Sequence, residues 1–291
     1  MTESRKKQRA LKTRKIFIKT SLILGLIIIV GFFAIYLNEK HATSVMQKNS
    51  VSVNKSHAGQ PSPDAGMKKG VESPATKKHK GQTDKMIYLT FDDGPSSSTN
   101  EILDILQKYH AKATFFMLAP HMTEHPDVVK RIVADGHGTG LHGVTHNAKH
   151  FYQSKQTVVG EMDEAQQTLE NITGVHSVLV RPPYGSVPYL IQPYRKALEA
   201  KGYKLWDWTI DSADWSMPSE KHVKNTIKQI KKVGKFDETL VVLMHDKPTT
   251  AKYLTELLDY LAEQGYHMER IDASIPSMHF NCYDRCHPLK T

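Results

Sequence analysis

From Met86 onward, short apolar runs alternate with amphipathic segments of helical length. Parallel strands connected by crossover helices produce this alternation, because helices cover both faces of such a sheet. The expected strands are residues 86–91, 113–118, 139–142, 178–181, 204–209, 240–244 and a weaker one near Met268. The expected helices are residues 99–109, 126–135, 158–172, 189–201, 219–233 and 250–264. Several of them end at a glycine, a common helix C-terminal signal.

About seven β-α units favour an α/β fold of the distorted (β/α) barrel type over an open doubly wound sheet. No glycine-rich phosphate loop follows the first strand, as a doubly wound nucleotide-binding fold would require. In such barrels the functional side chains lie at the carboxyl ends of the strands. Unusual polar clusters follow the expected strands at residues 92–95, 142–146, 181–185, 211–215 and 245–246. The sequence therefore predicts an active site at this end of the barrel.

The chain before Met86 has a different composition. Residues 20–37 form an uncharged and almost entirely apolar stretch, which is long enough to span a bilayer. A basic segment, residues 1–19, precedes it and is expected to stay in the cytoplasm. Residues 38–85 are rich in Lys, Ser, Pro and Gly and predict a flexible linker. We expect a single-pass anchor in the cell membrane and an extracytoplasmic domain at residues 86–291; a cleaved signal peptide is the alternative.

The positive charge of the chain belongs to its N-terminal part. Residues 1–85 hold 17 Lys and Arg against 5 Asp and Glu, which leaves 22 against 25 for the rest. A nucleic-acid enzyme carries its positive charge on the folded surface that meets the phosphates. We therefore expect no nucleic-acid partner, and we expect the protein to be a monomer.

Asp92 and Asp93 directly follow the first expected strand and precede a Gly-Pro turn. Two adjacent carboxylates at the end of a buried strand are costly unless a cation or hydrogen bonds compensate them. A single aspartate here could be a turn cap, but two in succession indicate a functional site.

His142 and His146 have the spacing that lets two imidazoles on one helical turn reach the same metal. The pairs His121/His125 and His146/His150 share this spacing, but only the first pair begins at a strand end. We expect the other histidines at the surface. Two histidines and one carboxylate leave coordination positions open for water and substrate, as in hydrolytic zinc sites.

His245 ends another expected strand and is the natural general acid for such a site. Either Asp214 or Asp246 could hold its tautomer. Farther on, Cys282 and Cys286 favour a local disulfide outside the cytoplasm. A small metal site with the flanking histidines and a pair of free thiols are the alternatives.

Five motifs stand in order at residues 90–95 (TFDDGP), 142–146 (HGVTH), 181–184 (RPPY), 211–215 (DSADW) and 243–246 (LMHD). Over about residues 86–270 the chain resembles the NodB-type polysaccharide deacetylases, carbohydrate esterase family 4. The resemblance implies that Asp92 is the general base and that Asp93, His142 and His146 bind the metal. Gly143 stands where the family has Ser or Thr, which leaves a loop-stabilising hydrogen bond open.

The other motifs imply further roles by the same resemblance. Arg181 would orient Asp92 and keep it ionised, and the Tyr184 backbone N–H would help to bind the oxyanion. His245 would be the catalytic acid, tuned by Asp214. The pocket for the acetyl methyl would have two walls, Leu243 and Trp208.

The resemblance implies a metal-dependent hydrolase that removes N-acetyl groups from N-acetylglucosamine in a polysaccharide and releases acetate. Zn²⁺ is the expected cofactor, with Co²⁺ or Mn²⁺ as other options. An anchored, outward-facing domain suggests a cell-wall glycan as substrate, and peptidoglycan in particular. Two alternatives stay open: an O-acetyl esterase acting on xylan or another glycan, and a wall-binding domain that has lost catalysis.

Overall fold

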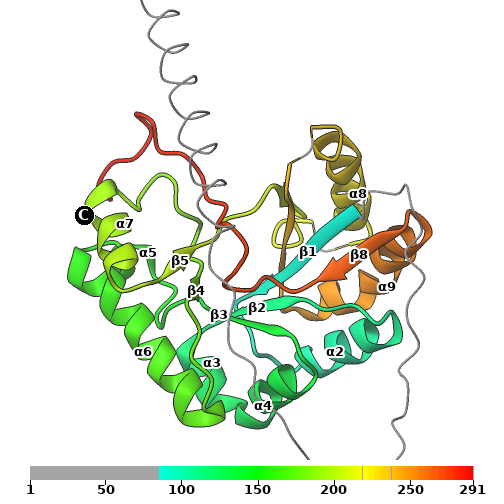
Figure 1. Cartoon of the computed structure of the whole chain (residues 1–291), viewed down its shortest axis with the longest axis horizontal. Coiled ribbons are helices and arrows are strands. Elements are labelled where there is room, and N and C mark those ends of the chain that lie inside the picture. Colours follow the sequence, from blue (N-terminus) through cyan, green and yellow to red (C-terminus); the bar gives the residue numbers. More distant parts are fainter. Residues whose placement is uncertain (1–84, 218, 237, 291) are drawn as a thin grey trace, which may run out of the picture. The chain divides into compact units, whose positions relative to one another are not determined.

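Eight parallel strands form one curled sheet in the computed structural model, which describes residues 85–217, 219–236 and 238–290 (Figure 1). The strands are β1 (Lys85–Asp92), β2 (Thr114–Met117), β3 (Gly138–Leu141), β4 (Leu179–Val180), β5 (Lys204–Leu205), β6 (Ile210–Asp211), β7 (Leu240–His245) and β8 (Tyr266–Glu269). Their spatial order is β5-β4-β3-β2-β1-β7-β6, and β8 pairs with the first half of β1. The expectation of a parallel α/β sheet is confirmed.

The helices follow one another around the outside of this sheet (Figure 1). They are α2 (Thr99–Lys108), α3 (Ala119–Glu124), α4 (Pro126–Ala134), α5 (Ala148–Phe151), α6 (Lys155–Thr173), α7 (Gln192–Ala200), α8 (Lys221–Val233) and α9 (Pro248–Glu263). All six expected helices are present, with ends shifted by at most three residues. The short helices α3 and α5 were not expected, because neither is long enough to show a helical period.

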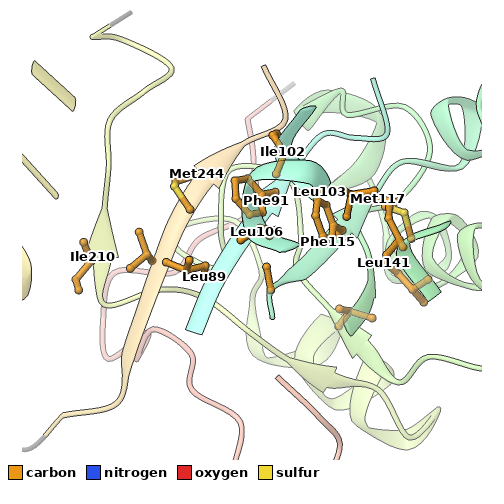
Figure 2. Packing of buried hydrophobic residues seen from close by; sticks show 14 of the residues in the cluster. Leu89, Phe91, Ile102, Leu103, Leu106, Phe115, Met117, Leu141, Ile210 and Met244 are labelled. Atoms are coloured by element: carbon orange, nitrogen blue, oxygen red, sulfur yellow. The ribbon is translucent and has the colours of Figure 1, made fainter. Parts of the chain in front are cut away.

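Both faces of the central strands are buried, which explains their continuous apolar runs. On β1, Leu89 and Phe91 pack against the surrounding helices in the main core (Figure 2). Tyr88 points to the other face and packs in a second cluster around Phe116 and Val241. The alternation continues along β1, so Asp92 shares the inward face with Tyr88. The first predicted site residue is thereby placed inside the curl of the sheet.

The expected strand at residues 204–209 is wrong in one respect. The chain forms β5 at the start of this range and β6 directly after it, and these two strands lie at opposite edges of the sheet. The Trp206 backbone N–H donates to the Val180 carbonyl at 2.9 Å, and the Thr209 N–H donates to the Val241 carbonyl at 3.0 Å. Residues 206–209 therefore cross the opening between the two edges. In the described sheet the two edge strands, β5 and β6, are not paired with each other, so the barrel is incomplete.

The predicted anchor at residues 20–37, the cytoplasmic tail and nearly all of the predicted linker lie outside the described residues. Within the described part of the chain, no helix is long and apolar enough to cross a membrane. The predicted disulfide is confirmed, since Cys282 and Cys286 are bonded with their Cα atoms 5.1 Å apart.

Gly140 on β3 offers a test of the packing inside the sheet. A methyl group there would overlap the ring of Phe116, which is fully buried. We expect Gly140→Ala to lower the free energy of unfolding by about 1–3 kcal/mol, the usual cost of overpacking a core. Urea denaturation followed by circular dichroism measures this change.

Gly160 is the matched control, because it is exposed in α6 and an added methyl would meet no atom within 4 Å. Gly160→Ala should raise stability by about 0.5–1 kcal/mol through helix propensity. Equal stability of Gly140→Ala and the wild type would contradict the packing described here.

Candidate active site

The polar clusters that follow the strands meet at the carboxyl ends of the strands. They surround a pocket of about 390 Å³. Its lining residues are Asp92, Asp93, His142, His146, Tyr184, Gly185, Trp208, Asp211, Trp215, Leu243, His245 and Lys247. Eight of the predicted site residues are in this set, and the other two, Arg181 and Asp214, bond directly to members of it.

Asp93, His142 and His146 form a cluster suited to a cation. Their ligand atoms lie within 4.8 Å of one another. The Asp93 Oδ1 atom is 3.4 Å from His142 Nε2 and 3.3 Å from His146 Nε2. This oxygen is buried and has no hydrogen-bond partner among the described residues. An orphaned carboxylate oxygen facing two imidazole nitrogens fits a divalent metal.

The tautomer of His142 also suits metal binding. Its Nδ1 atom lies 2.6 Å from the Arg181 carbonyl oxygen, which can only accept, so Nδ1 carries the proton. The Nε2 lone pair is then directed to the Asp93 side. Burial alone would raise the pKa of Asp93, but the two facing imidazoles, those of His142 and His146, outweigh it and hold that pKa well below its usual range.

Asp92 is 3% exposed and forms an ion pair inside the sheet. Its Oδ1 accepts a hydrogen bond from Arg181 Nη1 at 2.8 Å. Arg181 is fully buried and also donates to the Thr90 hydroxyl and to the carbonyls of Trp206 and Asp207. The Oδ2 atom of Asp92 lies 3.9 Å from His142 Nε2. One oxygen of Asp92 is thus held by Arg181, while the other faces the metal cluster.

His245 is adjacent to Asp92 across the β1–β7 ladder. Its Nδ1 lies 2.7 Å from Asp214 Oδ1, and its backbone N–H donates to Asp214 Oδ2 at 2.7 Å. Burial alone would lower the pKa of His245, but the hydrogen bond and charge of Asp214 outweigh it and raise that pKa. A carboxylate on Nδ1 leaves Nε2 as the nitrogen for proton transfer.

The structure distinguishes Asp214 from Asp246, the other carboxylate considered as partner of His245. The Asp246 carboxylate accepts hydrogen bonds from the hydroxyl of Ser96, between β1 and α2, and from the hydroxyl of Thr99, the first residue of α2. Asp246 therefore holds the segment that follows Asp93.

Tyr184 is 57% exposed and has a positive φ of 66°. Its hydroxyl donates to the His146 carbonyl at 3.0 Å, and its ring lies 4.8 Å from the imidazole of His146. Asp93 and His146 also have positive φ, at 71° and 46°. Such values are uncommon outside glycine and are frequent at functional sites.

Glu161 on α6 is a site residue that the sequence reasoning missed. Its buried carboxylate accepts the backbone N–H groups of Val144 and Thr145 at 2.8 and 2.9 Å and the Thr145 hydroxyl at 2.7 Å. Glu161 holds the loop that carries His146. Its hydrogen bonds stabilise this loop although Gly143 has no side-chain hydroxyl to do so. The sequence does contain a signal for Glu161, because this glutamate stands among the apolar positions of α6 that face inward.

The histidines outside the metal pair, His121, His125 and His150, were expected at the surface, and this is wrong for the first two, which are half-buried. The Nδ1 atom of His121 lies 2.6 Å from the Asp93 carbonyl oxygen. His150 is exposed, as expected. The short helix α3 places His121 beside Asp93, and the sequence reasoning did not predict that helix.

Comparison with known proteins shows which family the chain resembles. Residues 79–206 match the polysaccharide deacetylase family model. The chain is 44% identical to YheN of Bacillus subtilis over 206 residues, which is 70% of this chain and 72% of that protein. It is 40% identical over 199 residues to a peptidoglycan-N-acetylglucosamine deacetylase of Bacillus cereus, covering 67% of this chain and 72% of that protein.

Among solved structures, the polysaccharide deacetylase Bc1974 from Bacillus cereus superposes with a TM-score of 0.60 at 40% identity. The superposition covers 65% of this chain and 93% of that one. The chain therefore belongs to the polysaccharide deacetylases of carbohydrate esterase family 4, which are hydrolases of amide bonds.

Proposed function

We propose that this protein removes N-acetyl groups from N-acetylglucosamine residues of peptidoglycan in a metal-dependent reaction. The observation that carries the proposal is the meeting of a potential metal triad with the Asp92–Arg181 and His245–Asp214 pairs in one pocket. The Bacillus cereus relative named as a peptidoglycan-N-acetylglucosamine deacetylase supports the substrate. A wall-binding domain without catalysis would not need both pairs intact.

Asp93, His142 and His146 would hold the cation. Zn²⁺ is the expected ion for two imidazoles and one carboxylate, and Co²⁺ or Mn²⁺ could replace it. A divalent cation held by these residues would supply Lewis acidity toward the acetamide carbonyl and toward a water molecule.

The protein side chains would perform the proton transfers. Asp92 accepts the proton of the attacking water, and the hydrogen bond from Arg181 orients its carboxylate. The Tyr184 backbone N–H stabilises the negative charge that develops on the carbonyl oxygen. His245 donates its Nε2 proton to the departing nitrogen as the C–N bond breaks, so that acetate and a free amine are formed. Leu243 and Trp208 form the walls around the acetyl methyl.

Asp92→Asn and Asp93→Asn should separate the base from the ligand. Asp92→Asn leaves the three proposed ligands intact, so metal content should be retained while turnover falls by about two to four orders of magnitude. Asp93→Asn replaces an anionic ligand with a neutral one, so metal content and turnover should fall together. The two measurements are the metal content of the purified full-length variants and their rate on an N-acetylglucosamine oligomer.

His245→Ala is the matched control, because it should keep its metal and lose rate as Asp92→Asn does. If Asp92→Asn lost its metal and Asp93→Asn kept it, Asp92 would be the metal ligand and Asp93 the general base. Wild-type rates in both Asp92→Asn and His245→Ala would refute the mechanism. A product sugar with a new free hydroxyl instead of a free amine would identify the protein as an O-acetyl esterase.

The pH dependence of the rate should depend on Asp214. His245 acts as an acid only when protonated, so the rate should fall as the pH rises through its pKa. Because Asp214 raises that pKa, Asp214→Asn should move the alkaline fall to lower pH. Profiles of kcat/KM against pH for both proteins test this, and an unchanged alkaline limb in Asp214→Asn would exclude the assigned partner.

The proposed location is the outer side of the cell membrane, with residues 20–37 as a single-pass anchor and residues 86–291 as a monomeric catalytic domain. The apolar stretch and its basic N-terminal flank support this topology. A protease added to intact cells should cut within residues 38–85 and release the domain. Immunoblotting of the medium checks this, and cutting only after lysis would reverse the orientation.

A further inference from the structure

The segment after β8 lies against a wall of the catalytic pocket. We define residues 277–287 as the C-terminal strap, which Figure 1 shows in red. Its Phe280 ring meets the ring of Trp208 edge to face, with centroids 5.0 Å apart and planes at 78°. Trp208 lines the catalytic pocket. An aromatic pair of this geometry stabilises the position of both rings.

Trp208 needs such support because of its place in the chain. It lies in residues 206–209, which cross the sheet opening outside any regular strand. Gly185 faces the ring so closely that a Cβ atom there would lie 2.8 Å from Trp208 Cη2. The ring is therefore in contact with the backbone of one loop and with the side chain of Phe280.

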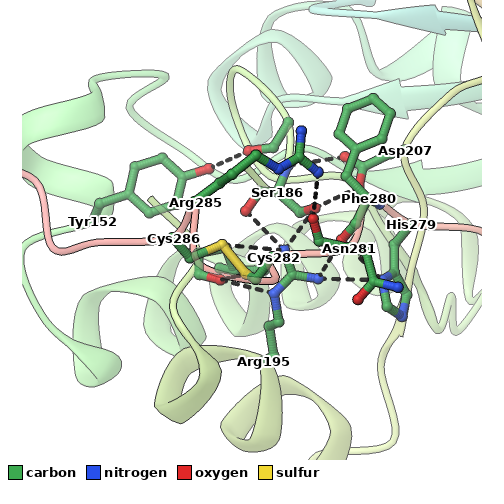
Figure 3. The surroundings of a disulfide bond; sticks show 12 residues. Tyr152, Ser186, Arg195, Asp207, His279, Phe280, Asn281, Cys282, Arg285 and Cys286 are labelled. Atoms are coloured by element: carbon green, nitrogen blue, oxygen red, sulfur yellow. Dashed lines mark hydrogen bonds between the residues drawn. A yellow bond between two sulfur atoms is a disulfide. The ribbon is translucent and has the colours of Figure 1, made fainter. Parts of the chain in front are cut away.

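Hydrogen bonds hold the strap to the residue next to Trp208 (Figure 3). The Asp207 backbone N–H donates to the Met278 carbonyl at 2.8 Å, and the Phe280 N–H donates to the Asp207 carboxylate at 2.6 Å. Asp207 is fully buried, and the same carboxylate accepts the Ser186 N–H at 2.9 Å. Asp207 thus joins the strap to the loop that precedes α7.

A second connection comes from Arg195 on α7. Its Nη1 donates to the Phe280 carbonyl at 3.1 Å, and its Nη2 donates to the Ser186 carbonyl at 3.0 Å (Figure 3). The Phe280 backbone is consequently held through both its N–H and its carbonyl.

The disulfide closes the strap between two docked points. Phe280 lies before Cys282, and His287 follows Cys286. The His287 N–H donates to the Pro188 carbonyl at 3.0 Å, and its ring packs on Tyr189. The covalent bond limits the conformations of the strap between these points.

We propose, on the basis of the function proposed above, that Phe280 is a positioning residue that sets the acyl-group specificity of the pocket through Trp208. Phe280 itself is absent from the pocket lining, so it acts only through the wall. With Trp208 held in place, the pocket admits an acetyl methyl and excludes a longer chain. The disulfide between Cys282 and Cys286 keeps Phe280 against Trp208.

The experiment compares N-acetyl and N-propionyl glucosamine oligomers as substrates of the full-length protein. In Phe280→Ala the ratio of kcat/KM for acetyl over propionyl should fall by about tenfold, a typical value for discrimination of one methylene group. Phe280→Leu should give an intermediate ratio because it retains part of the contact. Metal content should stay at the wild-type value in both variants, since no metal ligand is altered.

Tyr283→Ala is the matched control, because Tyr283 lies on the same strap and is 82% exposed. It should keep the wild-type ratio. The double variant Cys282→Ser/Cys286→Ser should change the ratio in the direction of Phe280→Ala. An unchanged ratio in both Phe280 variants with normal metal content would overturn the proposal.

An NMR measurement that does not depend on catalysis tests this proposal separately from the proposed function. The chain has three tryptophans, and the indole N–H resonance of Trp208 can be assigned with Trp208→Phe. Phe280→Ala should shift this resonance, whereas Tyr283→Ala should not. If the wild type lacks deacetylase activity, the function fails while the shift still tests the contact. An absent shift overturns the proposal even in an active enzyme.

Discussion

The buried guanidinium of Arg181 connects the fold to the chemistry. It pairs with Asp92 inside the sheet, donates to the segment that crosses the opening, and lies 4.2 Å above the ring of Phe116. A buried charge is tolerated only when it is paired and hydrogen-bonded, and Arg181 meets both conditions. Removing one member of such a pair typically costs about 3–5 kcal/mol, because the other charge stays buried. The packing inside the sheet and the orientation of Asp92 therefore depend on the same side chain.

Buried carboxylates hold the surrounding loops and side chains in position through hydrogen bonds. Glu161 holds the loop of His146, Asp214 orients His245, and Asp207 joins the strap to the loop of Ser186. Each accepts two or more hydrogen bonds, which offset its burial. Supporting interactions of this kind keep ligands and catalytic groups in position, and they allow strained residues such as Asp93 to persist.

Much of the fold and the site could be predicted from residue patterns. Strong apolar periodicity located every expected helix, and the strand-end positions of Asp92, His142 and His245 brought them to one edge of a parallel sheet. The prediction was wrong for residues 204–209, where the chain leaves the sheet after β5 instead of continuing as one strand. The pattern could not show that Trp206 is buried across the opening of the sheet, because period and propensity carry no information about distant edges.

Residue types and their order were enough to establish the α/β class, the two adjacent carboxylates and the histidine pair, because these depend on local spacing. Strand-end position alone left both Asp214 and Asp246 as partners of His245, and the family resemblance pointed to Asp214. The structure shows the contact itself, with Asp214 on His245 and Asp246 on Ser96. Glu161, His121 and Phe280 required the three-dimensional structure, because they approach the site from distant segments. Hydrogen bonds and ring contacts between such segments exist only when the chain has closed around them, so no local pattern contains them.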